Sequence, residues 1–351
     1  MAASYRFARW CIGREPSLPR ILVLDGGVST HLGDTFRYRE LWSSSLLLDE
    51  TNGERILRQG HHDWLHAGAN VLSTVTYQCH YASDLWPSSN ISLDTARVDR
   101  MWSDAIRICQ EALAEYEQKK DEPYHPASNP KLHPHFILVS SGCFGAALAN
   151  GAEYTGDYGD ATQDMLMDFH RRKLQRVQAI DPEQVVAIET VPSLKECQAL
   201  RALLLNEDKL PPCTILFACR NGSELNDGTP LGTALNLLAD VPIESLVGWG
   251  VNCCPPLYIA ELLRSIASHP PYDRGLMVYP NAGDEWDAVN EAWVPPSDDG
   301  CDDTVEHIME AVRKVESPRN VLVGGCCRTT PDTIRKLQSS VQKYLQAEQK
   351  L

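Results

Sequence analysis

The sequence lacks three features that would assign it to large classes of protein. It has no run of about 18 apolar residues, the length that a helix needs to cross a bilayer. Basic residues form no block and the formal net charge is −15, so nucleic acid is not expected as a partner. The N-terminus has no sustained apolar core followed by a cleavage site, which argues against a secretory signal. We therefore expect a soluble, cytoplasmic protein with neither a membrane nor nucleic acid as partner.

The chain also lacks the cysteine spacing of a zinc finger or ribbon, although it contains twelve cysteines. Dense cysteines in a small secreted domain indicate disulfides. Here they are diluted over 351 residues without a secretion signal, which favours reduced thiols, some buried and some bound to metal. Hydrophobic residues make up 43% of the chain and charged residues 23%, a composition typical of a globular protein with a sizeable core.

Short runs of β-branched and aliphatic residues recur along the chain and alternate with helical patterns. These runs predict eight strands, at residues 21–25, 70–76, 136–140, 184–189, 214–218, 245–251, 276–279 and 320–324. Nearly continuous apolar strands, each followed by a helix, favour an α/β fold of the (β/α)8 TIM-barrel type. An open doubly wound sheet is the alternative, because alternation alone fits both.

No linker divides the chain, and we expect one barrel domain over residues 1–351 with two insertions. The segment 119–135 is rich in Pro, Lys, His and Asn and is typical of an exposed loop, so its three histidines are not expected to form a metal cluster. The segment 281–303 carries two tryptophans and an acidic stretch, and we expect it near the mouth of the barrel.

Three segments carry helix start signals. Thr51–Glu54 and Ser193–Glu196 match the capping box, in which a hydroxyl and a carboxylate satisfy each other's backbone N–H groups. Thr330 is followed by a proline and an acid, which predicts a helix that begins at Pro331.

Two of the predicted strands end at cysteines: one runs into Asn252-Cys253 and the other into Gly324-Gly325-Cys326-Cys327. If these strands neighbour one another in one parallel sheet, three sulfurs converge at its carboxyl edge. Three thiolates around an open fourth position form a zinc site suited to activating a substrate thiol. The alternative is packing, because a free cysteine is often a small buried hydrophobe. The adjacent pair after two glycines favours metal, because both thiols face one ion only where the backbone bends.

Polar residues gather at the ends of the other predicted strands, where the chemistry of a barrel is found. Asp25 and Glu189 are either structural caps or ligands for an ammonium group. Beside glycines whose backbone can approach a ligand, the two acids favour an amino acid whose carboxylate meets backbone N–H groups. The candidate substrate-binding residues are Asp25, Gly26, Gly27, Thr76, Tyr77, Glu189 and Asn252.

Seven segments together resemble the homocysteine S-methyltransferases: residues 25–27, 151–158, 188–192, 227–230, 250–253, 278–281 and 324–331. The resemblance spans about residues 20 to 338. It implies a zinc-bearing (β/α)8 barrel in which Cys253, Cys326 and Cys327 match the metal ligands. It also implies that Asp25 and Glu189 match the acids that hold the homocysteine amino group.

Within that family, residues 153–158, 227–230 and 279–281 resemble the branch that uses S-methylmethionine or S-adenosylmethionine more than the betaine-using branch. The betaine enzymes carry a long C-terminal extension, whereas this chain stops soon after its last helix. His31 and the run 141–145 differ from the residues usual in that branch. Cys254 has no family counterpart and is expected to pack in the core.

The resemblance implies transfer of a methyl group from a sulfonium to the sulfur of homocysteine, giving methionine, with Zn²⁺ activating the thiol. Tyr77 or Trp249 is a candidate to face the sulfonium by a cation–π contact. The alternatives are a betaine- or selenocysteine-using enzyme of the same family and a catalytically silent barrel with a structural zinc site, for which Cys254 would be the fourth ligand. A zinc hydrolase would more naturally use His and carboxylate ligands.

Overall fold

The computed structural model of the protein describes residues 2–33, 39–81, 93–119, 134–283, 285–287, 292–294, 304–315 and 319–348. Eight parallel strands form one sheet in the order β1-β10-β7-β6-β5-β4-β3-β2. Their bounds are β1 Ile21–Val23, β2 Val71–Ser73, β3 Phe136–Gly142, β4 Val186–Val191, β5 Cys213–Phe217, β6 Leu246–Asn252, β7 Gly275–Tyr279 and β10 Val321–Val323. All eight predicted strands are present.

The first and last strands of this order close the sheet into a barrel. The Asn70 N–H donates to the Val23 carbonyl at 2.6 Å, and the Asp25 N–H donates to the Val71 carbonyl at 3.0 Å. Leu24 pairs with Val71 as an isolated parallel bridge. The predicted (β/α)8 TIM barrel is therefore confirmed, and the open sheet is excluded.

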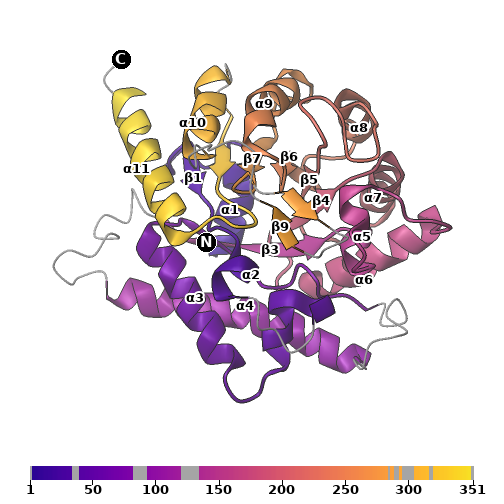
Figure 1. Cartoon of the computed structure of the whole chain (residues 1–351), viewed down its shortest axis with the longest axis horizontal. Coiled ribbons are helices and arrows are strands. Elements are labelled where there is room, and N and C mark those ends of the chain that lie inside the picture. Colours follow the sequence, from indigo (N-terminus) through magenta and orange to yellow (C-terminus); the bar gives the residue numbers. More distant parts are fainter. Residues whose placement is uncertain are drawn as a thin grey trace.

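Helices surround the strands, and each barrel strand is followed by at least one (Figure 1). The longer outer helices are α3 Gly53–Ala67, α4 Thr95–Gln118, α6 Gln163–Ile180, α7 Leu194–Asn206, α8 Leu231–Leu238, α9 Ile259–Ser268, α10 Thr304–Lys314 and α11 Pro331–Glu348. Short helices lie in the connections: α2 Val28–Leu32, η1 Arg39–Leu48, α5 Phe144–Ala147, η3 Ala152–Tyr154 and η4 Pro256–Tyr258.

An additional helix, α1 Ala3–Cys11, precedes the barrel and packs against its interior. Phe7 and Trp10 of this helix are fully buried, and Phe7 stacks on Phe136 at the start of β3, with 5.2 Å between ring centroids. Because α1 covers the end where the strands begin, the opposite, carboxyl end of the barrel is left for a site.

Strand alternation decides which side chains face that interior. Trp249 and Val251 belong to the core between strands and outer helices, whereas Ala187 and Met277 pack inside the barrel with α1. Arg274 lies over the Trp249 ring at 4.8 Å. The prediction that Trp249 faces a substrate is therefore wrong, because its place in the strand directs it away from the pocket.

The predicted helix starts have mixed outcomes. Thr330 Oγ1 accepts from Thr333 N at 3.3 Å, and α11 begins at Pro331 as predicted. Ser193 Oγ caps α7 by accepting from Glu196 N at 3.3 Å, but the Glu196 carboxylate binds groups outside this helix start, so only the serine half of that capping box is confirmed. The capping box at Thr51 is wrong: Asp49 accepts the Thr51 N–H, and α3 has no side-chain cap. Glu54, its expected partner, instead binds arginines on α3 and α4.

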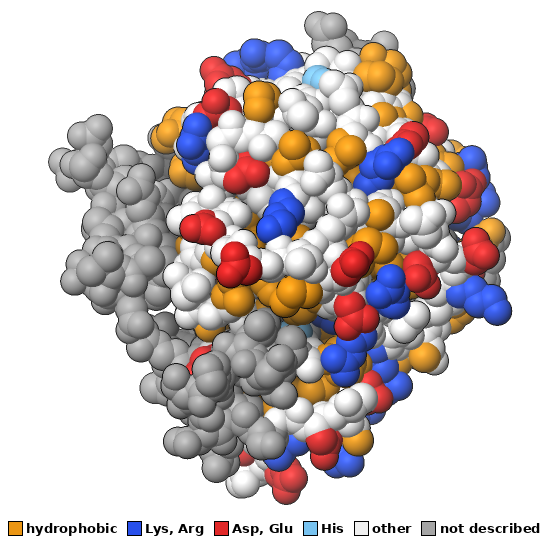
Figure 2. All heavy atoms as spheres, turned by 90° about the vertical axis from the view of Figure 1, so that its right-hand side faces the viewer, with side chains coloured by type: hydrophobic (Ala, Val, Ile, Leu, Met, Phe, Trp, Pro, Cys, Tyr) orange, Lys and Arg blue, Asp and Glu red, His pale blue; other side chains and the backbone are white. Residues whose placement is uncertain are grey.

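The insertion predicted at 119–135 lies almost entirely outside the described residues. Within 281–303, β8 Glu285–Asp287 pairs with β9 Ala292–Val294 as an antiparallel hairpin, and most of the remainder is outside the described residues. Among the described helices, none is both long and apolar enough to span a membrane. On the face drawn in Figure 2, acidic and basic side chains lie interspersed.

Candidate active site

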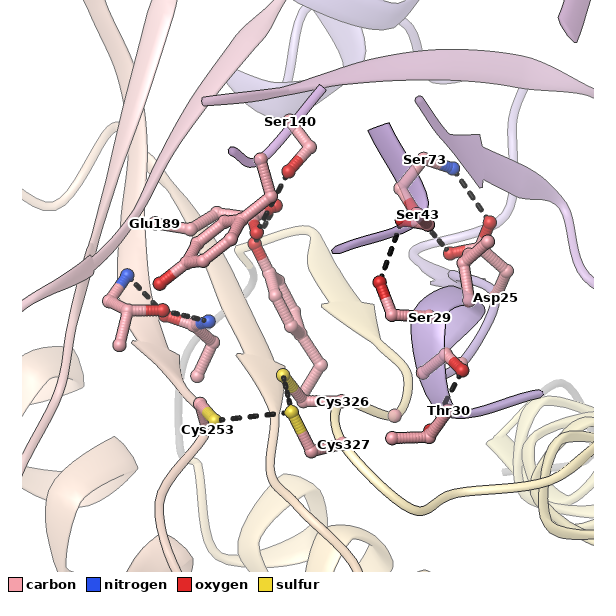
Figure 3. A pocket seen from close by; sticks show the side chains of 18 of the residues that line it. Asp25, Ser29, Thr30, Ser43, Ser73, Ser140, Glu189, Cys253, Cys326 and Cys327 are labelled. Carbon is pink, nitrogen blue, oxygen red and sulfur yellow. Dashed lines mark hydrogen bonds between the residues drawn. The ribbon is translucent and has the colours of Figure 1, made fainter. Parts of the chain in front are cut away.

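Three thiols converge at the carboxyl end of the barrel (Figure 3). The Sγ atom of Cys327 lies 3.8 Å from that of Cys253 and 4.0 Å from that of Cys326, and all three sulfurs lie within 4.8 Å of one another. All three cysteines are free. Tetrahedral Zn²⁺ with Zn–S bonds of about 2.3 Å holds its sulfurs about 3.8 Å apart. The spacing therefore fits three ligands of one metal ion.

The two cysteine-bearing strands are not neighbours, as the simplest reading of the sequence required, because β7 lies between β6 and β10. The end of β7 joins the two cysteine loops instead. The Cys253 N–H donates to the Tyr279 carbonyl at 3.1 Å, and the Cys326 N–H donates to the Pro280 carbonyl at 2.8 Å. The thiols therefore meet over the end of β7.

Backbone strain accompanies this convergence. Cys253 has φ +51°, a left-handed conformation that non-glycine residues rarely adopt. Such conformations cost roughly 1–3 kcal/mol and persist where the surroundings hold them in place. A Cβ atom on Gly27 would lie 2.5 Å from the Cys326 carbonyl oxygen, so only glycine allows the β1 loop to approach the cysteine pair.

The adjacent Cys254 lies outside the thiol group. It is 1% exposed and packs in the main hydrophobic core, as predicted. Among the described residues, the group of possible metal ligands within 4.8 Å contains Cys253, Cys326 and Cys327 and no fourth member. A closed structural zinc site needs four protein ligands. The observed set therefore favours a site with a position left for substrate.

Each of these thiols changes the pKa of its neighbours. The hydrogen bond with Cys326 and burial raise the pKa of the Cys253 thiol, and the hydrogen bond with Cys253 raises that of Cys327. Coordination to a metal ion would instead lower the pKa values of these thiols, because a coordinated thiol loses its proton.

A pocket, about 740 Å³ with the open solvent at its mouth, opens beside the thiols. Its described lining includes three carboxylic acids, Asp25, Glu153 and Glu189, and contains no Lys, Arg or His. The predicted residues Gly26, Gly27, Tyr77 and Asn252 line it as well.

Asp25 is 1% exposed and is held by one partner residue. The Ser73 N–H donates to Asp25 Oδ2 and the Ser73 hydroxyl to Oδ1, both at 2.7 Å. Burial raises the pKa of Asp25 to about 8, the two Ser73 hydrogen bonds lower it, and the charge of Glu189 raises it further.

Glu189 lies across the pocket from Asp25 (Figure 3). It accepts from Ser140 Oγ at 3.1 Å and from the Tyr279 hydroxyl at 3.2 Å. Burial raises its pKa to about 7, although both hydrogen bonds oppose this. Two buried acids with raised pKa values form a pocket that favours a cationic ligand.

Asn252 forms hydrogen bonds with Thr190, the residue that follows Glu189. Its Oδ1 atom accepts from Thr190 N at 2.8 Å, and its Nδ2 atom donates to Thr190 Oγ1 at 2.9 Å. Thr190 has φ +60°, and the pairing of β4 with β5 shifts register between Ile188 and Val191. Asn252 therefore stabilises the irregular turn that follows Glu189.

Thr76 and His31 are placed elsewhere. Thr76 is fully buried, its hydroxyl donates to the Ser140 carbonyl at 2.6 Å, and it is not among the pocket-lining residues. It ties the end of β2 to β3, because the chain turns after Ser73. His31 contacts Asp63 at 3.0 Å and the Trp64 ring, and is likewise absent from the lining.

The sequence reasoning missed several lining residues. Trp42 lines the pocket with φ +46°, and its ring centroid lies 6.4 Å from that of Tyr77. Trp42 lies at a kink inside η1, and no periodicity of the sequence signals such a position. Glu153 and Tyr154 also line the pocket, and they stand in a segment that carried the family resemblance without being assigned a role.

The homocysteine S-methyltransferase family model matches residues 22–341. The chain belongs to the homocysteine S-methyltransferase family. It is 33% identical over 325 residues to homocysteine S-methyltransferase 2 of Zea mays, covering 92% of this chain and 90% of that protein. It is 32% identical to a selenocysteine methyltransferase of Astragalus bisulcatus, covering 92% and 94% of the two chains.

The fold is similar to that of a solved family member. The metallated form of the homocysteine methyltransferase MmuM from Escherichia coli superposes with a TM-score of 0.71 at 27% identity, covering 92% of this chain and 96% of that one. The fold of this chain is therefore that of a family with a metallated member.

Proposed function

We propose that this protein is a zinc-dependent homocysteine S-methyltransferase that moves a methyl group from S-methylmethionine, or S-adenosylmethionine, to homocysteine and forms methionine. The observation that carries the proposal is the convergence of three free thiols beside a pocket that holds two buried acids. This arrangement provides for both ends of a thiol-bearing amino acid.

Cys253, Cys326 and Cys327 would hold the metal. When bound, Zn²⁺ supplies a Lewis acid that keeps a coordinated substrate thiol deprotonated near neutral pH. An unperturbed thiol is mostly protonated at that pH, and the thiolate is the nucleophile. The protein then needs no general base for the acceptor.

Asp25 and Glu189 would hold the homocysteine ammonium group. A carboxylate offers about four acceptor sites, and each of these acids uses only two in the described structure. An ammonium between them supplies the opposite charge that favours their ionised forms. The Gly27 N–H already donates to Thr329 Oγ1 at 3.0 Å, so the Gly26 N–H is the candidate donor to the substrate carboxylate.

Aromatic residues on the pocket wall support a sulfonium as the methyl donor. Tyr77 and Trp42 are a pair of aromatic rings on the pocket wall, and a sulfonium over an aromatic face gains about 0.5–2 kcal/mol. A sulfonium is also a better methyl donor than betaine, because a neutral thioether leaves more readily than a tertiary amine. We place S-methylmethionine above betaine for these reasons and for the branch-like segments of the sequence.

Selenocysteine is the second candidate acceptor, because a relative at 32% identity is a selenocysteine methyltransferase. A selenol presents the same soft anion to the metal. The two acceptors differ in chain length, so the distance from the acids to the metal decides between them.

The test is a matrix of acceptors and donors with purified, zinc-loaded protein. Homocysteine and selenocysteine are each combined with S-methylmethionine, S-adenosylmethionine and betaine, and the methylated product is quantified by mass spectrometry. We expect the highest rate with homocysteine and S-methylmethionine and none after chelation of the metal. Faster turnover of betaine than of either sulfonium would overturn the donor assignment, and no methylated product in any combination would overturn the function.

A further inference from the structure

The pocket contains a third acid whose carboxyl group is only partly used by the protein. Glu153 lines the pocket and is 5% exposed. Its Oε2 atom is buried and has no hydrogen-bond partner among the described residues. Buried polar atoms without partners are rare because they lose their hydration without compensation. A ligand is the natural partner for such an atom at a pocket wall.

The backbone around Glu153 is held firmly. Glu153 lies in η3, and its carbonyl accepts from Asn226 Nδ2 at 2.8 Å. A Cβ atom on Gly145 would lie 2.6 Å from the Glu153 nitrogen, so the neighbouring segment packs directly against this turn. The carboxyl group therefore has a defined position.

The other residues of this segment have structural roles. Thr155 Oγ1 accepts the Asp157 N–H at 3.2 Å, and the Tyr158 hydroxyl donates to Glu196 at 2.5 Å. Gly156 has φ +73° and packs against Pro192 and Asp227. The Glu153 carboxyl group remains without a structural explanation.

The three acids of the pocket differ in their position and in their partners. Asp25 follows β1 and Glu189 lies in β4, and each accepts two hydrogen bonds from described residues. Glu153 lies in η3, in the connection between β3 and β4, and its Oε2 atom accepts none from them. Glu153 is therefore separate from the pair proposed for homocysteine.

We propose that Glu153 binds the positively charged sulfur of the methyl donor. This inference rests on the proposed function, in which the two substrates bring three cationic groups to a pocket with three acids and no basic lining residue. Asp25 and Glu189 serve the acceptor's ammonium group, which leaves Glu153 for the donor.

The chemistry of the step determines how Glu153 acts. A bond forms between the acceptor sulfur and the methyl carbon, and the bond from that carbon to the donor sulfur breaks. Its electron pair stays on the donor sulfur, which becomes a neutral thioether. Because the positive charge fades during transfer, a carboxylate beside it stabilises the bound donor at least as much as the transition state. Glu153 therefore lowers KM for the donor and promotes release of the uncharged product.

The experiment compares zinc-loaded wild type with Glu153→Gln, which keeps the size of the side chain and removes its charge. Asp160→Asn is the matched control, because Asp160 is an exposed acid seven residues along the same connection. The probes are S-methylmethionine as substrate and 2-amino-5-methylhexanoic acid as competitive inhibitor. The inhibitor has the same shape and the same ammonium and carboxylate groups, with an uncharged carbon in place of the sulfonium.

In Glu153→Gln we expect KM for S-methylmethionine to rise ten- to a hundredfold while kcat changes less than about threefold. The Ki of the uncharged inhibitor, the KM for homocysteine and the zinc content should remain at their wild-type values, as all quantities should in Asp160→Asn. Equal weakening of S-methylmethionine and inhibitor would assign Glu153 to the ammonium group or to structure, and unchanged KM would exclude a donor role; both overturn the inference. If wild type itself forms no methionine from a sulfonium, the proposed function fails and this inference fails with it.

Discussion

Two sets of buried acids in this protein have opposite environments. Glu196 on α7 is fully buried and accepts from Phe144 N, His170 Nε2 and the Tyr158 hydroxyl, at 2.5 to 2.7 Å. Burial raises its pKa, but these partners outweigh burial and leave the pKa below its ordinary value. Asp25 and Glu189 in the pocket are also buried, yet their pKa values rise to about 8 and about 7.

The pKa values differ because the protein supplies a different number of hydrogen-bond donors to Glu196 than to each pocket acid. The protein gives Glu196 enough donors to stabilise its ionised form, so Glu196 organises the chain around the start of α7. Asp25 and Glu189 accept hydrogen bonds from hydroxyl groups and an N–H, but no Lys, Arg or His lines the described pocket. A bound cation would therefore stabilise their ionised forms. The first set is built for stability and the second for binding.

The largest expected effect concerns the thiols, whose partner is proposed to be a metal. Cys253→Ser, Cys326→Ser or Cys327→Ser should lose bound zinc and methyl transfer together, because two remaining thiolates hold the ion weakly. Cys254→Ser is the neighbouring control and should keep both, with some loss of stability from its core position. Metal analysis by mass spectrometry alongside the activity assay checks this. Full zinc in all three variants would contradict the assignment.

The next effect tests the structural acid. Glu196→Gln should lower the free energy of unfolding by about 3–5 kcal/mol, because it breaks a buried charged network and leaves polar groups without partners. Glu189→Gln is the matched control in the pocket and should lose much less. Urea unfolding of both variants at neutral pH provides the measurement. Similar losses in the two would show that the distinction between the sets is wrong.

The third effect tests the binding acids. Asp25→Ala and Glu189→Ala should each raise KM for homocysteine about ten- to a hundredfold, since a lost charge-assisted hydrogen bond costs about 1.5–3 kcal/mol. Zinc content should stay at the wild-type level. Steady-state kinetics with homocysteine varied at saturating donor checks this. Wild-type kinetics in both variants would reduce the two acids to structural caps.

The smallest effect is on the pH dependence of stability. The folded pKa of Glu189 lies above its unfolded value, so its contribution is full below about pH 4.5 and is lost as the pH rises through about 7. Stability of the ligand-free protein should therefore fall between about pH 5 and pH 8, with the raised pKa of Asp25 acting in the same direction, and Glu189→Gln should remove the Glu189 share of this fall. The contribution of Glu196 has the opposite sign: its folded pKa is lowered, so this contribution is lost only as the pH falls below about 4.5. Unfolding curves at pH 5 and pH 8 check the Glu189 share, and parallel curves for wild type and Glu189→Gln would contradict the raised pKa.

Much of the barrel could be predicted from the sequence because its strands are short apolar runs that alternate with helical patterns. The thiols could be predicted for the same reason, since each follows directly from the end of such a run. The capping box at Thr51 failed because Glu54 pairs with arginines of α3 and α4, one of them distant in the sequence. The prediction that Thr76 binds substrate failed because β2 ends at Ser73, earlier than the apolar pattern indicates.

The sequence by itself determined the strand number, the three cysteines that follow two of the strands and the family of the protein, because these depend on local pattern and residue identity. Only the tertiary structure decided that β7 lies between the two cysteine-bearing strands and joins their loops through its carbonyl groups. It alone also separated Glu196, which the protein neutralises with its own donors, from Glu189 and Glu153 in the pocket. The physical reason is that hydrogen-bond partners and burial are properties of neighbours in space, and the residues that surround a carboxylate can come from anywhere in the chain.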